Sequence, residues 1–156
     1  MEARATLEQT GRVAVLSLSC SGRGAPVLEA AAAAMDAAHV AALVLRGPPE
    51  AFALAATPRL CDALAGASVP VVAACAGALE DGAVELALAA GYRLATPATS
   101  FSFPGIANGR LPRAGGVHRL VRLVGGAEAA ARLLHPRAAT AAQAERTGLV
   151  DGVARG

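Results

Sequence analysis

The sequence contains no lysine, and all 14 basic residues among its 156 are arginines. Without a lysine amine, catalysis through a Schiff base and phosphate binding by a phosphate-loop lysine are both excluded. Aromatic residues are also scarce, at 3% of the chain against 54% apolar residues overall, so we expect a core of alanine, valine and leucine. Such a core must be closely packed, because small side chains bring backbones near to one another.

Long apolar runs and paired cysteines are missing as well. No apolar run reaches the roughly 18 residues of a transmembrane helix, and the N-terminal segment lacks the layout of a signal peptide, so we expect a cytoplasmic protein without membrane contact. Cys20, Cys61 and Cys75 form no CxxC pair and have no histidine at metal-ligand spacing, which predicts reduced thiols and no metal site. The formal net charge is only +2, and the arginines form no aromatic-interleaved patch, so nucleic acid is not an expected partner.

Short β-like runs alternate with helical segments along the chain. We expect strands at 12–19, 41–47, 69–77, 92–96 and 100–104, and helices at 27–38, 58–66, from about 82 to 90, and at 117–134 with a break at a glycine pair. Residues 47–59 are expected to form a loop. Thr140 and Gly148 fit the N-cap and the stop of a last helix. The alternation predicts an α/β fold with a largely parallel sheet, in a single domain over residues 1–156.

The stretch "GALEDGAVELALAAG" at 77–91 carries the side chains with the most chemistry. A strand that feeds a helix leaves unpaired N–H groups above the turn, so the N–H of Gly82 is a candidate oxyanion donor, and the loop after the preceding strand offers a second donor at Ala56. Glu85 is then within reach of the same pocket as a general acid or base. A structural interpretation stands beside this one: if Gly82 is the N-cap, Glu85 is the N3 residue whose carboxylate reaches back to the cap N–H. Because caps are far commoner than active sites, the pattern alone favours the cap.

Several ordered blocks resemble one known family. The stretch 69–125, from "VPVVAACAGALEDGAVELALAAG" through "SFSFPG" to "GGVHRLVRLVG", is similar to the enoyl-CoA hydratase/isomerase (crotonase) superfamily, in which an apolar strand, a glycine-rich turn, a Glu-Leu-Ala helix, a Phe-x-x-Pro strand and a Gly-Gly loop follow in this order. "AALVLRGPPEAFALAAT" and "AERTGLVDGVA" resemble two further segments of that family. The resemblance implies a crotonase-like (ClpP/crotonase) α/β fold, a spiral of ββα units, here lacking the family's C-terminal helical region.

The resemblance also implies roles for three residues. The backbone N–H groups of Ala56 and Gly82 would bind a thioester carbonyl as an oxyanion hole, and Glu85 would be a catalytic carboxylate. It implies a second glutamate directly after the proline of the Phe-x-x-Pro strand, where this chain has Gly105. Ordinary two-carboxylate hydration therefore lacks one partner.

Other candidate residues surround this turn. Glu80 and Asp81 take turn positions that are usually apolar and glycine in the family, and one of them, or His118, is a possible acid or base or a polar pocket group. The structural alternatives are that the two acids face solvent and that His118 has only a structural role. Arg110 and Arg113 are possible phosphate contacts, although loop arginines are more often solvated.

The resemblance implies an enzyme of acyl thioesters, either acyl-CoA or acyl-carrier-protein, that stabilises an enolate and acts as an isomerase, lyase or hydratase. Coenzyme A or phosphopantetheine would enter as part of the substrate, with no covalently bound cofactor. The expected partners are the thioester and either further copies of this chain in a homo-oligomer or a homologous partner chain. The alternative is a catalytically degenerate member that serves as a binding or assembly partner. The acyl group and the direction of reaction are not specified by the sequence.

Overall fold

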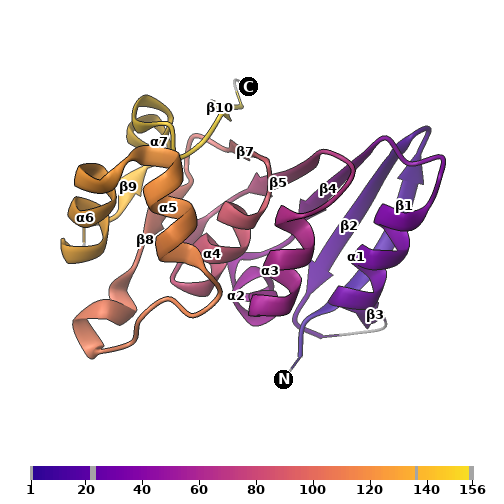
Figure 1. The fold of residues 1–156 in the computed structure, drawn as a ribbon, viewed down its shortest axis with the longest axis horizontal. Coiled ribbons are helices and arrows are strands. Elements are labelled where there is room, and N and C mark those ends of the chain that lie inside the picture. The colour runs from indigo at the N-terminus through magenta and orange to yellow at the C-terminus, as the bar shows by residue number, and fades with distance from the viewer. Residues whose placement is uncertain (1, 22–23, 136, 155–156) are drawn as a thin grey trace.

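The computed structural model describes residues 2–21, 24–135 and 137–154, and it forms two sheets with helices packed against them (Figure 1). The larger sheet has the strand order β10-β7-β5-β4-β2-β1-β3, and the smaller sheet has the order β6-β8-β9. The strands are β1 (Arg4–Thr10), β2 (Val13–Ser19), β3 (Ala25–Pro26), β4 (Ala42–Arg46), β5 (Val71–Cys75), β6 (Ala78–Glu80), β7 (Tyr92–Ala95), β8 (Ser100–Ser102), β9 (Ala139–Thr140) and β10 (Gly152–Val153). The helices are α1 (Val27–Asp36), α2 (Pro49–Ala55), α3 (Pro58–Ala65), α4 (Gly82–Ala89), the 3₁₀ helix η1 (Pro104–Asn108), α5 (Gly116–Val124), α6 (Gly126–Leu134) and α7 (Ala141–Thr147).

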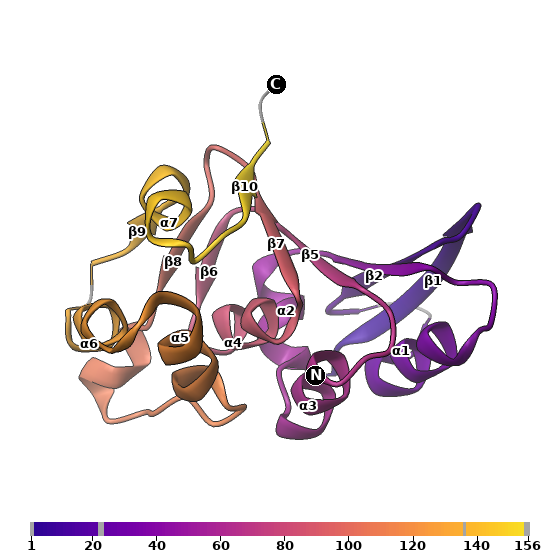
Figure 2. The same cartoon turned by 45° about the horizontal axis from the view of Figure 1, so that its top comes forward.

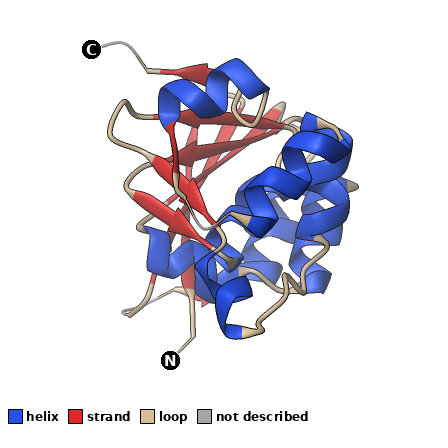
Figure 3. Ribbon diagram, turned by 90° about the vertical axis from the view of Figure 1, so that its left-hand side faces the viewer, coloured by secondary structure: helices blue, strands red, loops and turns tan. Residues whose placement is uncertain are grey.

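The centre of the larger sheet is parallel, as the alternation of strands and helices predicts. Strands β2, β4, β5, β7 and β10 pair in parallel, with Leu43 opposite Val71 and Leu45 opposite Ala73. Helices α1, α3 and α4 lie along one face of this sheet (Figure 2), and most helices lie on the same side of the strands (Figure 3). Because β4 and β5 are parallel, their carboxyl ends lie at the same end of the sheet. Helix α2 follows β4 there, and α4 begins shortly after β5 and β6.

Two units of two strands and a helix build the middle of the chain. Strand β5 belongs to the larger sheet, β6 to the smaller one, and α4 follows; β7 and β8 divide in the same way and lead through η1 to α5. The parallel pair β6 and β8 therefore places the turn before α4 beside the segment that leads into η1. The ββα spiral that the sequence resemblance implied is confirmed.

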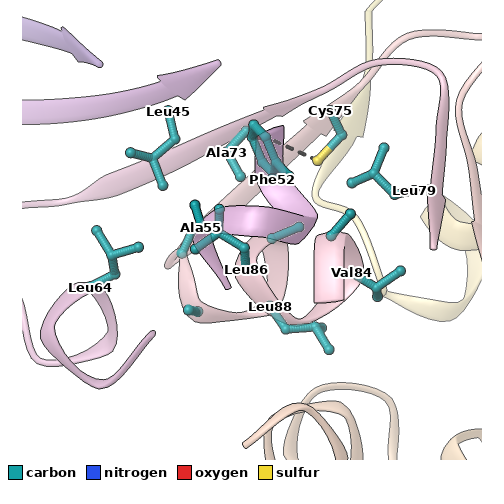
Figure 4. Close-up of a cluster of buried hydrophobic side chains, with 14 of the residues drawn as sticks. Leu45, Phe52, Ala55, Leu64, Ala73, Cys75, Leu79, Val84, Leu86 and Leu88 are labelled. Carbon is teal, nitrogen blue, oxygen red and sulfur yellow. Dashed lines mark hydrogen bonds between the residues drawn. The ribbon is translucent and has the colours of Figure 1, made fainter. Parts of the chain in front are cut away.

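Helix α4 lies at the centre of the core, and all its residues from Ala83 to Ala89 are buried. A helix that is apolar on every side is stable only when other elements cover it completely. Here α2, α3 and α5 contact it, and the close-up in Figure 4 shows Phe52, Leu86 and Val84 in one apolar cluster with Leu79 and Cys75. The many alanines of α4 allow these helices to approach closely.

One expectation from the sequence was wrong in this part of the chain, and one strand was missed. Residues 49–55 form α2 and not a loop, because Pro49 occupies a first-turn position that tolerates a missing N–H and the following "EAFALA" has high helix propensity. Strand β1 was not expected, because only Ala5 of its seven residues is buried and no apolar alternation is visible. It forms a hairpin with β2 along its whole length, and its first two residues also pair with the short edge strand β3.

The predicted ends of the last helices are confirmed. The glycine pair separates α5 from α6, with Gly125 at φ 83°. Thr140 begins α7 with a capping box to Gln143, and Gly148 ends it in the left-handed conformation, as expected for a glycine stop.

The buried Arg93 of β7 connects the final segment to the sheet. Its guanidinium donates to the carbonyl oxygens of Leu149 (2.9 Å) and Ala90 (2.6 Å) and to the carboxylate of Asp151 (2.9 Å). The carboxylate of Asp151 also accepts the backbone N–H of Arg93 at 2.8 Å. A buried guanidinium is stable only when its donors are paired, and here the pairing fixes the chain between α7 and β10.

Candidate active site

The start of α4 provides an unpaired backbone donor. Asp81 is the N-cap, its N–H donates to the carbonyl oxygen of Ser102 at 3.0 Å, and its own carbonyl accepts the N–H of Glu85 at 3.1 Å. Gly82 is the first helical residue, and its N–H donates to no protein acceptor among the described residues. Because the N-terminus of a helix carries a partial positive charge, this N–H is suited to bind an anionic oxygen.

Glu85 is buried, with 4% of the residue exposed, and its carboxylate accepts three backbone N–H groups. Oε1 accepts from Arg113 at 3.0 Å, and Oε2 accepts from Ala114 at 2.7 Å and from Gly116 at 2.9 Å. Since Gly116 is the first residue of α5, the carboxylate satisfies orphan donors at the N-terminus of that helix. The expected capping box was therefore wrong: Asp81 and not Gly82 is the N-cap of α4, and Glu85 caps a different helix.

The two predicted oxyanion donors lie next to each other, but only one is free. A Cβ built on Gly82 would lie 3.4 Å from the Cβ of Ala56, so the end of α2 contacts the start of α4. The N–H of Ala56 donates to the carbonyl of Phe52 at 3.1 Å, within the last turn of α2. Ala56 can donate to a bound oxygen only if this hydrogen bond opens or is shared, and its role stays a prediction.

Asp81 directs its carboxylate at Gly105. The N–H of Gly105 donates to Oδ1 at 2.9 Å and to Oδ2 at 3.1 Å, and the guanidinium of Arg110 lies 3.9 Å from Oδ2. A Cβ built on Gly105 would lie 2.8 Å and 2.9 Å from the two carboxylate oxygens. The space beside Gly105, where the resemblance implied a second glutamate, is thus occupied by the side chain of Asp81.

One cleft of about 400 Å³ brings most of the predicted residues together. Its lining residues are Asp81, Gly82, Glu85, Arg110, Leu111, Pro112 and Arg113. Both arginine side chains are exposed at this cleft, where an anionic group of a ligand can reach them. The structure therefore joins two carboxylates, one free helix N–H and two guanidinium groups at one place.

Three of the predicted residues do not line this cleft: Ala56 at the end of α2, and the two acid–base candidates Glu80 and His118. Glu80 is exposed on β6, consistent with the solvent-facing alternative. His118 is exposed on α5 and lines a larger cavity of about 780 Å³ at the other end of α4, together with Arg119 and Arg122. This larger cavity contains neither Gly82 nor Glu85. Neither residue is placed to exchange protons with the cleft.

The loop that binds Glu85 was not predicted from the sequence. Its contribution comes from backbone N–H groups, which no side-chain motif reveals. The glycine pair at 115–116 was the available signal: Gly115 has φ 81°, and a Cβ on Gly116 would lie 2.6 Å from the Cγ of Glu85. The side chain of Arg119 fixes the same loop, since it donates to the carbonyl of Ala114 and to Asp62.

The two buried thiols are unsuited to nucleophilic chemistry. Burial raises the pKa of Cys61 to about 11, opposed by the positive charge of Arg119 and reinforced by Glu85 and Asp62. Burial raises the pKa of Cys75 to about 12, opposed by Arg93. Because the thiolate is the reactive form, both side chains are inert packing groups at neutral pH.

Within residues 2–21, 24–135 and 137–154, no three histidine, cysteine, aspartate or glutamate side chains form a group able to hold a metal ion. None of the helices in this part of the chain is long and apolar enough to cross a membrane.

Comparison with known proteins identifies the family to which the chain belongs. The family described as Enoyl-CoA hydratase/isomerase matches residues 49–155, and the chain belongs to this family. It is 38% identical over 144 residues to a probable enoyl-CoA hydratase of Rhizobium meliloti (strain 1021), covering 81% of this chain and 56% of that protein. It is 39% identical over 109 residues to the peroxisomal bifunctional enzyme of Danio rerio, covering 70% of this chain and 14% of that protein. The chain thus spans about half the length of the first relative, and a small part of the second.

Solved structures share the fold. An enoyl-CoA hydratase subunit I from Geobacillus kaustophilus HTA426 superposes with a TM-score of 0.81 at 26% identity, over 96% of this chain and 68% of that one. The DspI protein of Pseudomonas aeruginosa gives a TM-score of 0.82 at 24% identity, over 97% and 68% respectively. The fold is therefore the crotonase-like α/β fold.

Proposed function

We propose that the protein acts on acyl thioesters, either acyl-CoA or acyl-carrier-protein, by isomerase, lyase or hydratase chemistry through a stabilised enolate. Membership of the enoyl-CoA hydratase/isomerase family supports the class of substrate. Coenzyme A or phosphopantetheine would be part of that substrate, with its phosphates near Arg110 and Arg113 at the rim of the cleft.

The observation that carries this proposal is the pairing of Gly82 and Glu85 in one cleft. The N–H of Gly82 is free, and the carboxylate of Glu85 lies one helical turn further on. A carboxylate has about four acceptor positions, so three backbone donors leave Glu85 one position, on Oε1, for a substrate proton.

The proposed step is removal of the α-proton of the thioester. Glu85 accepts that proton, the C–H electron pair forms a carbon–carbon double bond, and the carbonyl oxygen becomes an oxyanion that accepts the N–H of Gly82. One oxyanion donor contributes roughly 10²–10³ in rate, so a single free N–H is enough to support measurable chemistry. Opening of the Ala56–Phe52 hydrogen bond on substrate binding would add the second donor.

The test is α-proton exchange in heavy water with a panel of acyl-CoA thioesters, read as deuterium uptake by mass spectrometry. We expect uptake with the parent protein and with a Glu80→Gln control, and a loss of at least about 10²-fold with Glu85→Gln. Because the amide introduced by Glu85→Gln would face backbone N–H groups, thermal unfolding of each variant and a Glu85→Asp variant separate loss of fold from loss of the base. Absence of uptake by the folded parent on every thioester would contradict the proposal.

A second candidate function is a binding or assembly partner without catalysis. It is favoured by the internal hydrogen bonds of the site, since the N–H of Ala56 is already paired and Glu85 already accepts three donors. A binding module would retain an acyl thioester, or associate with a second copy or a homologous chain, and release the thioester unchanged. Size-exclusion chromatography with light scattering, combined with recovery of the added thioester, distinguishes this function from the catalytic one.

A further inference from the structure

We propose that Asp81 is the second proton-transfer residue of the cleft, and that Gly105 is glycine because the Asp81 carboxylate occupies the space of a side chain at that position. This inference rests on the proposed acyl-thioester function and adds a second role to it: Glu85 takes the α-proton, and Asp81 gives a proton to another carbon of the same acyl group.

The backbone of Asp81 is the first observation. Its φ of 45° with ψ of −111° is the only positive φ at a non-glycine residue among those described. L-residues adopt this conformation at a cost in free energy, and such outliers are concentrated at functional sites. A glycine at position 81 would adopt it freely. The strained backbone therefore favours a specific use for the side chain.

The second observation is the close fit between Asp81 and Gly105. The Gly105 N–H binds both carboxylate oxygens, and an added Cβ would approach them to 2.8 Å and 2.9 Å, which is closer than real Cβ atoms come. The carboxylate is thus fixed by the strand end from which the expected glutamate is missing. The Asp81 carboxylate reaches Gly105 from the turn after β6, because β6 and β8 are neighbouring strands of the smaller sheet.

The third observation is the position of Asp81 in the cleft. Its side chain is 37% exposed, whereas Glu85 is 4% exposed as a residue, and both line the same cleft with Gly82. The charged group in contact with Asp81 is Arg110 at 3.9 Å, and Glu85 lines the same cleft. Asp81 can therefore exchange protons with solvent, while Glu85 is enclosed by its loop.

The step balances without an oxidant or reductant. With a 3-enoyl thioester, the Asp81 carboxylate first takes a proton from water and leaves hydroxide. Glu85 removes the proton at the α carbon, the double bond moves to the α and β carbons, and the γ carbon takes the proton from Asp81. Glu85 then gives its proton to the hydroxide, which restores water and both carboxylates. The product is the conjugated 2-enoyl thioester.

The test measures two rates on the same protein: deuterium exchange at the α carbon and formation of the conjugated 2-enoyl thioester by ultraviolet absorbance. For Asp81→Asn, which keeps an oxygen for the Gly105 N–H, we expect product formation to fall by about 10²-fold and exchange to stay within about threefold of the parent. The matched control is Glu80→Gln, the exposed neighbouring acid outside the cleft, which should leave both rates unchanged. Equal product formation by the parent and by Asp81→Asn would overturn the inference.

A double variant that moves the carboxylate from position 81 to position 105 provides an independent test. Asp81→Gly removes the strain and empties the space beside Gly105, so Asp81→Gly with Gly105→Glu places a carboxylate in the same cleft from the other strand. We expect the rate of product formation by this double variant to be at least tenfold higher than the rate of the Asp81→Gly variant alone. Failure to regain activity in a folded double variant would count against Asp81 as a proton donor. If the parent shows neither exchange nor product, the proposed function itself fails, an outcome that differs from loss of the Asp81 effect alone.

Discussion

Glu85 and Gly116 occupy adjoining space: a Cβ on Gly116 would lie 2.6 Å from the Cγ of Glu85 and 2.8 Å from its Oε2, while the Gly116 N–H donates to that same oxygen at 2.9 Å. The absence of a side chain at 116 thus lets the carboxylate reach the N-terminus of α5. The proposed base and the loop that fixes it depend on each other.

We expect Gly116→Ala to destabilise the protein by about 1–3 kcal/mol, because the added methyl group must displace either the Glu85 carboxylate or the α5 backbone. The deuterium exchange rate should fall with it, since Glu85 moves. The matched control is Gly126→Ala, also at the first position of a helix, where an added Cβ meets nothing within 4 Å. Urea unfolding measures the free energy of unfolding of both variants. Equal stability of the two would contradict the prediction, because it would show that the added methyl group at position 116 does not disturb Glu85 or α5.

Asp81→Gly should separate stability from activity. Relief of the positive-φ strain gains about 1–3 kcal/mol, and loss of the hydrogen bonds from Gly105 removes about 0.5–1.5 kcal/mol. We therefore expect an unchanged or slightly higher melting temperature, by up to a few degrees, together with reduced product formation. Differential scanning calorimetry beside the thioester assay measures both quantities. A melting temperature several degrees below that of the parent would mean that the conformation at 81 is not strained.

Arg93→Met should be among the most destabilising substitutions, at about 3–5 kcal/mol, because it leaves the Asp151 carboxylate and two backbone carbonyls without their donor. Arg122→Met is the control, since Arg122 is exposed. Asp151→Asn should cost less than Arg93→Met, because the Asp151 side chain is 38% exposed and water can replace it. Chemical denaturation orders the three variants, and an equal effect of Arg93→Met and Arg122→Met would contradict the buried pairing.

Cys61 and Cys75 should resist thiol reagents at pH 7–8, because burial raises their pKa values to about 11 and about 12. Labelling of the native protein should modify only Cys20, and unfolding should expose all three thiols. Because the two thiols stay protonated in the fold at pH values where the unfolded chain ionises, their contribution to stability is complete below about pH 9 and decreases as the pH rises toward their folded pKa values. Mass-spectrometric counting of labelled cysteines checks the first point, and urea unfolding between pH 8 and 10.5 checks the second.

The sequence predicted much of this fold because its strands and helices follow strong local patterns. The buried parallel strands have near-continuous apolar runs, and glycine or threonine marks the ends of the later helices. Strand β1 lacks such a pattern, since it is specified by its pairing with β2 and β3 and not by burial. Helix α2 was missed because prolines and a glycine before it suggested a loop.

The site was only partly predictable for a similar reason. The sequence by itself determined the order of the ββα units and the positions of Gly82 and Glu85 at the start of a buried helix, because local pattern and motif spacing decide both. Only the tertiary structure decided what the carboxylates do: it placed the Glu85 carboxylate against backbone N–H groups of the loop 113–116, and it filled the space beside Gly105 with the Asp81 carboxylate. Both relations join residues more than 20 positions apart, and both depend on backbone donors and on glycines without a Cβ, which no local pattern records.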